Sequence, residues 1–212
     1  GILVALLMPV IFTFLPMDDG SPMQLLDSVP KTAITFACAC FMVFFASMNP
    51  AASTAFSREG KQAWIMKMIP VPPRVLLLAK LLFGYSIAAA VCIAAAVSLL
   101  LLGLHTGSVC TALALALIMS FCATELTLLP DAHNPKYDWL NPTEVIKQGA
   151  NVALGILVCF VSTGVYAGLC FLTGTFVPAL APYLLALLSL AASAGAWLLL
   201  TRVSARGWEQ KE

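Results

Sequence analysis

Charge is the property that this sequence has least of. Only 10% of its 212 residues are Asp, Glu, Lys or Arg, whereas a soluble domain has about 25%. Hydrophobic residues make up 61% of the chain, which is more than a water-soluble fold of this size can cover. This composition excludes an ordinary cytosolic enzyme and a disordered chain. The net charge of +1 gives no electrostatic footprint for nucleic acid.

Several chemical signatures are also missing. The sequence contains no G-x-x-x-x-G-K-[ST] loop for a nucleotide and no T-V-G-Y-G filter of a channel. Its seven cysteines form no C-x-x-C pair and lie in apolar runs, as small buried hydrophobic residues do. His105 and His133 fall in loops on opposite sides of the predicted spans. We therefore predict no catalytic set, no metal site and no cofactor bound by this chain itself.

Long apolar runs dominate what is present. About 20 apolar residues cross a bilayer as a helix, and the runs predict an all-α membrane protein, a polytopic bundle of about six transmembrane helices. The runs lie near residues 1–15, 33–56, 79–103, 109–129, 151–173 and 179–201. The first is too short for a full span and starts without Met. We therefore expect a truncated first helix, in a single transmembrane domain (residues 1–212) that is a fragment of a longer protein.

The basic residues are divided unequally between the two sides of these spans. Lys31 falls on one side, next to the acidic segment 16–30. All other basic residues fall on the opposite side: Arg58, Lys61, Lys67, Arg74, Lys80, Lys136, Lys147, Arg202, Arg206 and Lys211. Since Lys and Arg favour cytoplasmic loops, we predict cytoplasmic segments at about 57–78 and 130–149 and a cytoplasmic tail at 202–212.

Two ionisable residues lie inside the predicted spans, Lys80 and Glu125. Lys80 is close enough to the cytoplasmic end to extend its ammonium group to the interface. Glu125 lies about five residues, or roughly 7 Å, from the end of its span at Pro130. One interpretation is a functional intramembrane carboxylate. The other is an ion pair between Lys80 and Glu125 on consecutive antiparallel helices.

The first cytoplasmic segment contains a short helical pattern. Residues 61–69 have helical length and end at Pro70. Trp64 and Met68 fall on the same side of this helix, although Lys61 shares that side. The helix could lie on lipid headgroups with Trp64 as its anchor. Alternatively, it could be presented to a cytoplasmic partner.

Three other patterns predict local structure. Within the second cytoplasmic segment, residues 131–139 form a polar loop with an aromatic tip, and Asn141-Pro142 begins a helix that leads into the fifth span. Asn49-Pro50 predicts a kink near the inner end of the second span. Gly164-x-x-x-Gly168 permits a close helix approach or belongs to ordinary membrane packing.

The first cytoplasmic segment resembles a known family. The run Ser57-Arg-Glu-Gly-Lys61, then Ile69-Pro70-Val71, then Ala79-Lys80 resembles the loop after the second helix of type-2 ATP-binding-cassette exporter permeases. The resemblance is strongest to a bacterial group of large exporter permeases. It extends over about residues 30 to 175, and the loops are more distinctive than the helices.

The second cytoplasmic segment resembles the same group. Asp131 followed by Pro135-Lys136-Tyr137-Asp138-Trp139, with Lys147-Gln148 and Asn151 downstream, is similar to an Asp-x-x-x-Pro-Lys-Leu-x-Trp pattern before the fifth helix of a six-helix unit. Tyr137 stands where Leu is usual. Because larger members carry two such units, the chain resembles the C-terminal one.

The resemblance implies a transmembrane permease subunit of an ATP-driven exporter in a bacterial cytoplasmic membrane. Such a subunit is not an enzyme, since ATP and Mg²⁺ are bound by a separate cytoplasmic ATPase, whose closure is passed on by short coupling helices. The resemblance assigns to that coupling element Arg58, Glu59, Gly60, Lys61, Trp64, Met68 and Pro70. It assigns to a second cytoplasmic contact Asp131, Pro135, Lys136 and Trp139. It also implies a second permease unit, in the same chain or as a homodimer.

Two other functions remain as alternatives. A fragment of an ion-coupled secondary transporter would place acidic residues and unwound helices near the bilayer midplane, whereas Glu125 is close to the interface. A non-transporting membrane scaffold would use the basic loops to recruit a cytoplasmic protein. Nothing in the sequence indicates the substrate.

Overall fold

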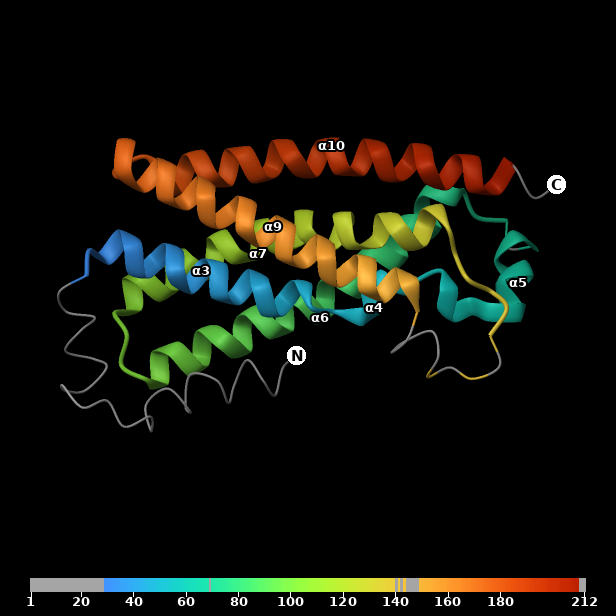
Figure 1. The fold of residues 1–212 in the computed structure, drawn as a ribbon, viewed down its shortest axis with the longest axis horizontal. Coiled ribbons are helices and arrows are strands. Elements are labelled where there is room, and N and C mark those ends of the chain that lie inside the picture. Colours follow the sequence, from blue (N-terminus) through green and yellow to red (C-terminus); the bar gives the residue numbers. More distant parts are fainter. Residues whose placement is uncertain (1–28, 69, 140, 142, 144–148, 210–212) are drawn as a thin grey trace.

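The computed structural model describes residues 29–68, 70–139, 141, 143 and 149–209, and the regular secondary structure in these ranges is entirely helical (Figure 1). Its helices are α3 (Lys31–Ser47), α4 (Pro50–Ser53), η1 (Ser57–Gln62), α5 (Ala63–Met68), α6 (Pro73–Leu101), α7 (Thr106–His133), α9 (Ala150–Phe176) and α10 (Ala181–Glu209). The predicted first span and most of the helix predicted to begin at Asn141 lie outside the described residues. Asn141 itself accepts the Thr143 N–H at 3.1 Å, as a residue that starts a helix does.

Four of the described helices are long and apolar enough to cross a membrane: α6, α7, α9 and residues 181–204 of α10. Each has a mean hydropathy of 2.0 or more over its most apolar window. These helices confirm four of the predicted spans, near 79–103, 109–129, 151–173 and 179–201. They indicate a multi-pass helical membrane protein.

The second predicted span is not one continuous helix. α3 ends at Ser47, and Asn49 starts the separate short helix α4 by accepting the Ala51 N–H at 2.9 Å. The Asn49 amide also donates to the Gly84 carbonyl of α6 at 2.9 Å, and Pro50 takes the first position of α4, where its missing N–H costs nothing. The predicted kink is therefore a complete break. The prediction of one helix as far as residue 56 is wrong.

α7 is the central helix of the bundle. It packs against α3, α4, α6, α9 and α10, and 61% of its most apolar window is buried. Only 22% of the most apolar window of α9 is buried, so most of α9 faces outward. Small residues such as Ala39, Ala112 and Ala116 have no exposed area, which allows close packing between helices when lipid surrounds the bundle.

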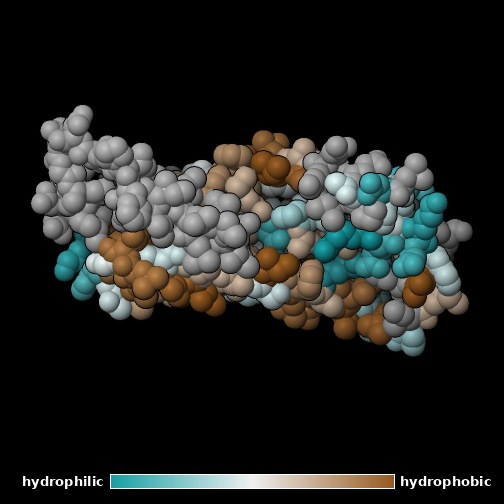
Figure 2. Space-filling view, turned by 90° about the horizontal axis from the view of Figure 1, so that it is seen from below, coloured by the Kyte–Doolittle hydropathy of each residue, from teal (hydrophilic) through white to brown (hydrophobic). Residues whose placement is uncertain are grey.

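One end of the bundle, which we call the basic end, carries η1, α5, the start of α6 and the segment 134–139 (Figure 1). Its basic side chains include Arg58, Lys61, Arg74, Lys80 and Lys136, whereas Lys31 starts α3 at the opposite end. In the face that Figure 2 shows, hydrophilic residues gather towards this end and hydrophobic residues cover much of the rest that is coloured.

Gly155, Gly164 and Gly168 of α9 differ in how closely another part of the chain approaches them. A Cβ on Gly155 would lie 2.6 Å from the Ser53 Cβ of α4, whereas a Cβ on Gly164 or Gly168 would meet nothing within 4 Å. The close approach of α9 inside this chain is therefore made at Gly155. Gly164 and Gly168 contribute no packing contact within the described residues.

We expect Gly155→Ala to lower the melting temperature of the purified protein in detergent. The added methyl group must displace Ser53, and such overpacking costs about 1–3 kcal/mol. The matched control is Gly164→Ala, which adds the same methyl group where there is open space and should stabilise its helix by up to about 1 kcal/mol. Equal melting temperatures for the two variants would contradict the contact between α4 and α9.

Candidate functional site

The carboxylate of Asp131, near the end of α7, is fully buried at the basic end. It accepts the backbone N–H groups of Phe56 at 2.6 Å and Ser57 at 3.0 Å, together with the Ser57 hydroxyl. The two backbone N–H groups bond to Oδ2, whereas Oδ1 accepts the Ser57 hydroxyl and, at 2.8 Å, the Asn151 amide of α9. Asp131 therefore caps the first turn of η1 from another helix, which satisfies N–H groups that have no partner within η1 and places negative charge at its N-terminus.

Ser57 connects the two predicted cytoplasmic segments. Its hydroxyl oxygen accepts the Lys136 N–H at 2.9 Å and the Asn151 amide at 3.3 Å. Its carbonyl accepts the Trp139 indole N–H at 2.8 Å. Residues that are about 80 positions apart in the sequence thus form one hydrogen-bonded unit, which we call the latch (Ser57, Asp131, Trp139 and Asn151).

Gly60 and Trp139 are in direct contact. Gly60 has φ 53° and ψ −136° in the middle of η1, and a Cβ there would lie 2.7 Å from the Trp139 ring. Both the backbone conformation and the close approach require a residue without a side chain. The resemblance assigned Gly60 to the coupling element and Trp139 to the second cytoplasmic contact, and the two residues lie against each other.

Lys80 does not pair with Glu125. Its ammonium group donates to Glu59 Oε1 at 2.5 Å and to the Ala55 carbonyl at 2.6 Å, and lies 4.8 Å from the centre of the Phe56 ring. The predicted Lys80–Glu125 pair is wrong, because η1 folds back over the start of α6 and brings a nearer carboxylate. Glu125 faces Ser193 of α10 instead.

Glu125 is a buried acid in a spanning helix. Only 1% of the residue is exposed, and one carboxylate oxygen has no hydrogen-bond partner among the described residues. Since a buried polar group without a partner is costly, the interpretation as a functional intramembrane carboxylate stays a prediction.

The helix predicted at residues 61–69 is divided between η1 and α5. Trp64, Ile65 and Met68 of α5 are 60%, 44% and 73% exposed. α5 lies at the basic end of the bundle (Figure 1). Lys61 and Pro70 are exposed as well. This part of the predicted coupling element is therefore an accessible apolar surface.

The other residues that the resemblance assigned to the two cytoplasmic contacts differ in their burial and in their contacts. Arg58 donates to the Ala51 carbonyl of α4, Glu59 accepts from Lys80 of α6, and Gly60 is buried. Asp131 has no exposed area, so it cannot itself touch another protein, and its assignment to a cytoplasmic contact is corrected to a positioning role. Pro135 and Trp139 are half-buried, whereas Lys136 exposes its side chain.

Sequence reasoning did not single out Ser57 and Asn151. Ser57 and Asn151 lie at the edges of the two motifs that carry the resemblance. The sequence does not indicate their partners, because no regular spacing links a hydroxyl or an amide side chain to the groups that it binds.

Burial, together with the nearby charges of Asp131 and Glu59, raises the pKa of Tyr137, so this side chain stays neutral beside the two acids.

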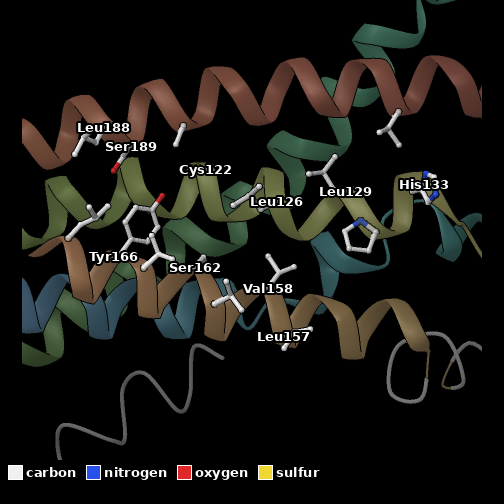
Figure 3. Close-up of a pocket in the computed structure, with 16 residues that line it drawn as sticks. Cys122, Leu126, Leu129, His133, Leu157, Val158, Ser162, Tyr166, Leu188 and Ser189 are labelled. Carbon is white, nitrogen blue, oxygen red and sulfur yellow. The ribbon is translucent and has the colours of Figure 1, made fainter.

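A large apolar cavity lies between α7, α9 and α10 (Figure 3). Its volume of about 650 Å³ is within the range of about 300–1,000 Å³ that is typical of small-molecule sites. The Tyr166 side chain of α9 points across it towards Ser189 of α10 (Figure 3), and His133 lies at one end. The wall is otherwise almost entirely hydrophobic.

The described residues hold no group of three or more His, Cys, Asp or Glu that could bind a metal ion. No protein-family model, curated protein or solved structure matches this chain. The class of the protein is accordingly defined by its fold, which is that of a multi-pass helical membrane protein. The latch lies at the basic end of this fold.

We expect Asp131→Asn to destabilise the latch by about 1.5–3 kcal/mol, because hydrogen bonds to a charged acceptor are replaced by weaker ones and an N–H₂ group faces other donors. Limited proteolysis should then cleave residues 57–68 faster than in the wild type. Asp138→Asn is the matched control, since Asp138 is an exposed acid of the same loop. Equal cleavage of the two variants would contradict the capping role of Asp131.

Proposed function

We propose that this chain is the membrane half of an ATP-driven exporter of the type-2 ATP-binding-cassette class, working with a separate cytoplasmic ATPase. The basic end then faces the cytoplasm of a bacterial cell, in line with the distribution of Lys and Arg. Together with a second permease unit, the spanning helices move a substrate by alternating access. The cavity between α7, α9 and α10 is the place in this unit where an apolar or amphipathic substrate would bind.

One observation carries this proposal. The two segments that resemble ATPase-contacting loops lie far apart in the sequence, yet the latch joins them into one unit through Ser57, Asp131 and Trp139. A lone lipid-bound helix would need no such bracing. A device that transmits force must be rigid, and buried hydrogen bonds to a charged carboxylate supply that rigidity.

The route of force transmission follows from the connections of the latch. α5 continues directly from η1, and η1 is held by Asp131 of α7 and, through Lys80, by α6. α7 in turn packs against every other long helix that the structure describes. A displacement of α5 by a partner would thus reach the centre of the bundle through two side-chain contacts.

We expect Trp64→Ala with Met68→Ala to release an ATPase that co-purifies with the tagged chain from its native membranes. Exposed aromatic residues that anchor an interface contribute about 2 kcal/mol or more, which is about 30-fold in affinity. The measurement is vanadate-sensitive ATP hydrolysis in the purified fraction, with chain insertion checked by membrane extraction.

The matched control is Leu101→Ala with Phe176→Ala. These residues are 83% and 81% exposed but lie at the ends of α6 and α9 away from the basic end. The control should keep the ATPase. Retention of the activity by the Trp64/Met68 double variant would refute the assignment of α5 as the coupling helix.

An ion-coupled transporter is the second candidate, and Glu125 is the observation that favours it. Its carboxylate is buried in an apolar helix of spanning length, with one oxygen lacking a partner among the described residues, and acidic residues inside spanning helices mark proton relays.

This alternative predicts that liposomes containing the wild-type chain take up protons when the outside is acidified, and that Glu125→Gln abolishes the uptake. A pH-sensitive dye inside the liposomes reports it, and Asp138→Asn serves as the control because Asp138 is exposed at the basic end. Uptake by the wild type that is no faster than in empty liposomes excludes proton coupling.

A further inference from the structure

A second cavity opens at the basic end, between η1 and the first turns of α6. Its volume is about 420 Å³, which is again within the range of about 300–1,000 Å³ for ligand sites. Unlike the cavity between α7, α9 and α10, it is lined by charged side chains: Arg58 and Glu59 of η1 and Lys80 of α6, with Phe83 at its apolar edge. The proposed function does not use this cavity.

The Arg58 guanidinium is fixed in the wall of the cavity. Nη2 donates to the Ala51 carbonyl at 2.8 Å, Nε lies 3.4 Å from the Thr54 carbonyl, and the group lies 5.5 Å from the centre of the Phe83 ring. These partners are neutral, so they hold the guanidinium in place without compensating its charge. Its other N–H groups have no acceptor among the described residues.

Lys80 and Glu59 make the remaining charges of the cavity. They neutralise each other at 2.5 Å, so the lining carries a net charge of one positive unit, that of Arg58. Lys80 has three N–H donors, of which two go to Glu59 and the Ala55 carbonyl. The cavity thus offers hydrogen-bond donors from two cations and room for one negative charge.

An apolar strip of α6 lies beside the cavity, on the adjoining face of the helix. Val75, Leu78, Leu82 and Phe83 are 52%, 41%, 49% and 53% exposed, and their spacing places them on adjoining faces of the helix. Phe83 belongs to both the strip and the cavity. A ligand that filled both would need a singly negative polar head and a long apolar tail.

We propose that this cavity binds the phosphate headgroup of an anionic phospholipid, with the acyl chains along the apolar strip of α6. A phosphate oxygen accepts hydrogen bonds from Arg58 and Lys80, a geometry that suits guanidinium–phosphate recognition. A zwitterionic head would bring its own cation next to Arg58, and free phosphate would leave the strip unused. The bound lipid would hold η1 against α6.

The experiment is native mass spectrometry of the purified, delipidated full chain. The protein is titrated with phosphatidylglycerol and with phosphatidylcholine of identical acyl chains. We expect the anionic lipid to bind more tightly by about fivefold or more, since each Lys or Arg near an anionic surface contributes about 1 kcal/mol. Equal binding of the two lipids overturns the proposal.

Two variants test the charge of the cavity separately from its structure. Arg58→Gln should remove the preference for the anionic lipid, whereas Arg74→Gln is the control, because Arg74 is an exposed cation of the same helix end that does not line the cavity. Gln62→Glu adds a negative charge at an exposed position of the lining and should reduce the preference without affecting folding. Gln62→Lys should increase it.

The other outcomes are equally decisive. A loss in Arg74→Gln as large as in Arg58→Gln would mean general attraction to the basic end and would overturn the site. Competition by millimolar inorganic phosphate as effective as by the lipid would reassign the cavity to free phosphate. Because no ATPase takes part in this measurement, its result is independent of the proposed exporter function.

Discussion

The polar end of this molecule depends on one buried carboxylate. Asp131 comes at the end of the central helix α7 and bonds to the first backbone N–H groups of η1. Without an acceptor, those N–H groups would be buried and unsatisfied, at a cost of about 1–3 kcal/mol each. The bond therefore decides where η1 lies. The position of η1 in turn places Glu59 beside Lys80, Gly60 against Trp139 and α5 at the basic end of the bundle.

The same constraint explains the division between buried and exposed residues at the basic end. Ser57 and Asp131 of the latch are polar and buried, because a hydrogen bond to a charged acceptor is strongest away from water. Trp64, Ile65 and Met68 of α5 are apolar and exposed, which is costly for a chain alone and favourable with a partner. The contrast between a rigid base and an exposed apolar tip is what a coupling element requires.

Periodic features of the structure were predictable from the sequence, and pairings in space were not. The apolar runs predicted α6, α7, α9 and α10 because span length follows from bilayer thickness. Asn49-Pro50 predicted a kink because proline acts locally, and the structure has a complete break there. The partner of Lys80 was mispredicted, since Glu59 reaches it only after η1 folds back.

The glycines of α9 show the same limit. Gly164 and Gly168 have the spacing of a packing motif, yet the close contact is made by Gly155 against Ser53, in a short helix that exists only because α3 breaks. Likewise, the two motifs at residues 57–61 and 131–139 were each visible in the sequence. The two motifs are joined by hydrogen bonds among Ser57, Asp131 and Asn151. These side chains come together only when the helices have packed, so the sequence alone does not predict the contact.

The central claim is that Asp131 holds the first turn of η1, and amide hydrogen exchange at Phe56 and Ser57 tests it most directly. Both amides should exchange slowly in the wild-type protein, at rates similar to those of amides in the middle of α7, because each donates to the buried carboxylate. Exchange as fast as that of the exposed α5 residues Trp64 and Ile65 would contradict the account.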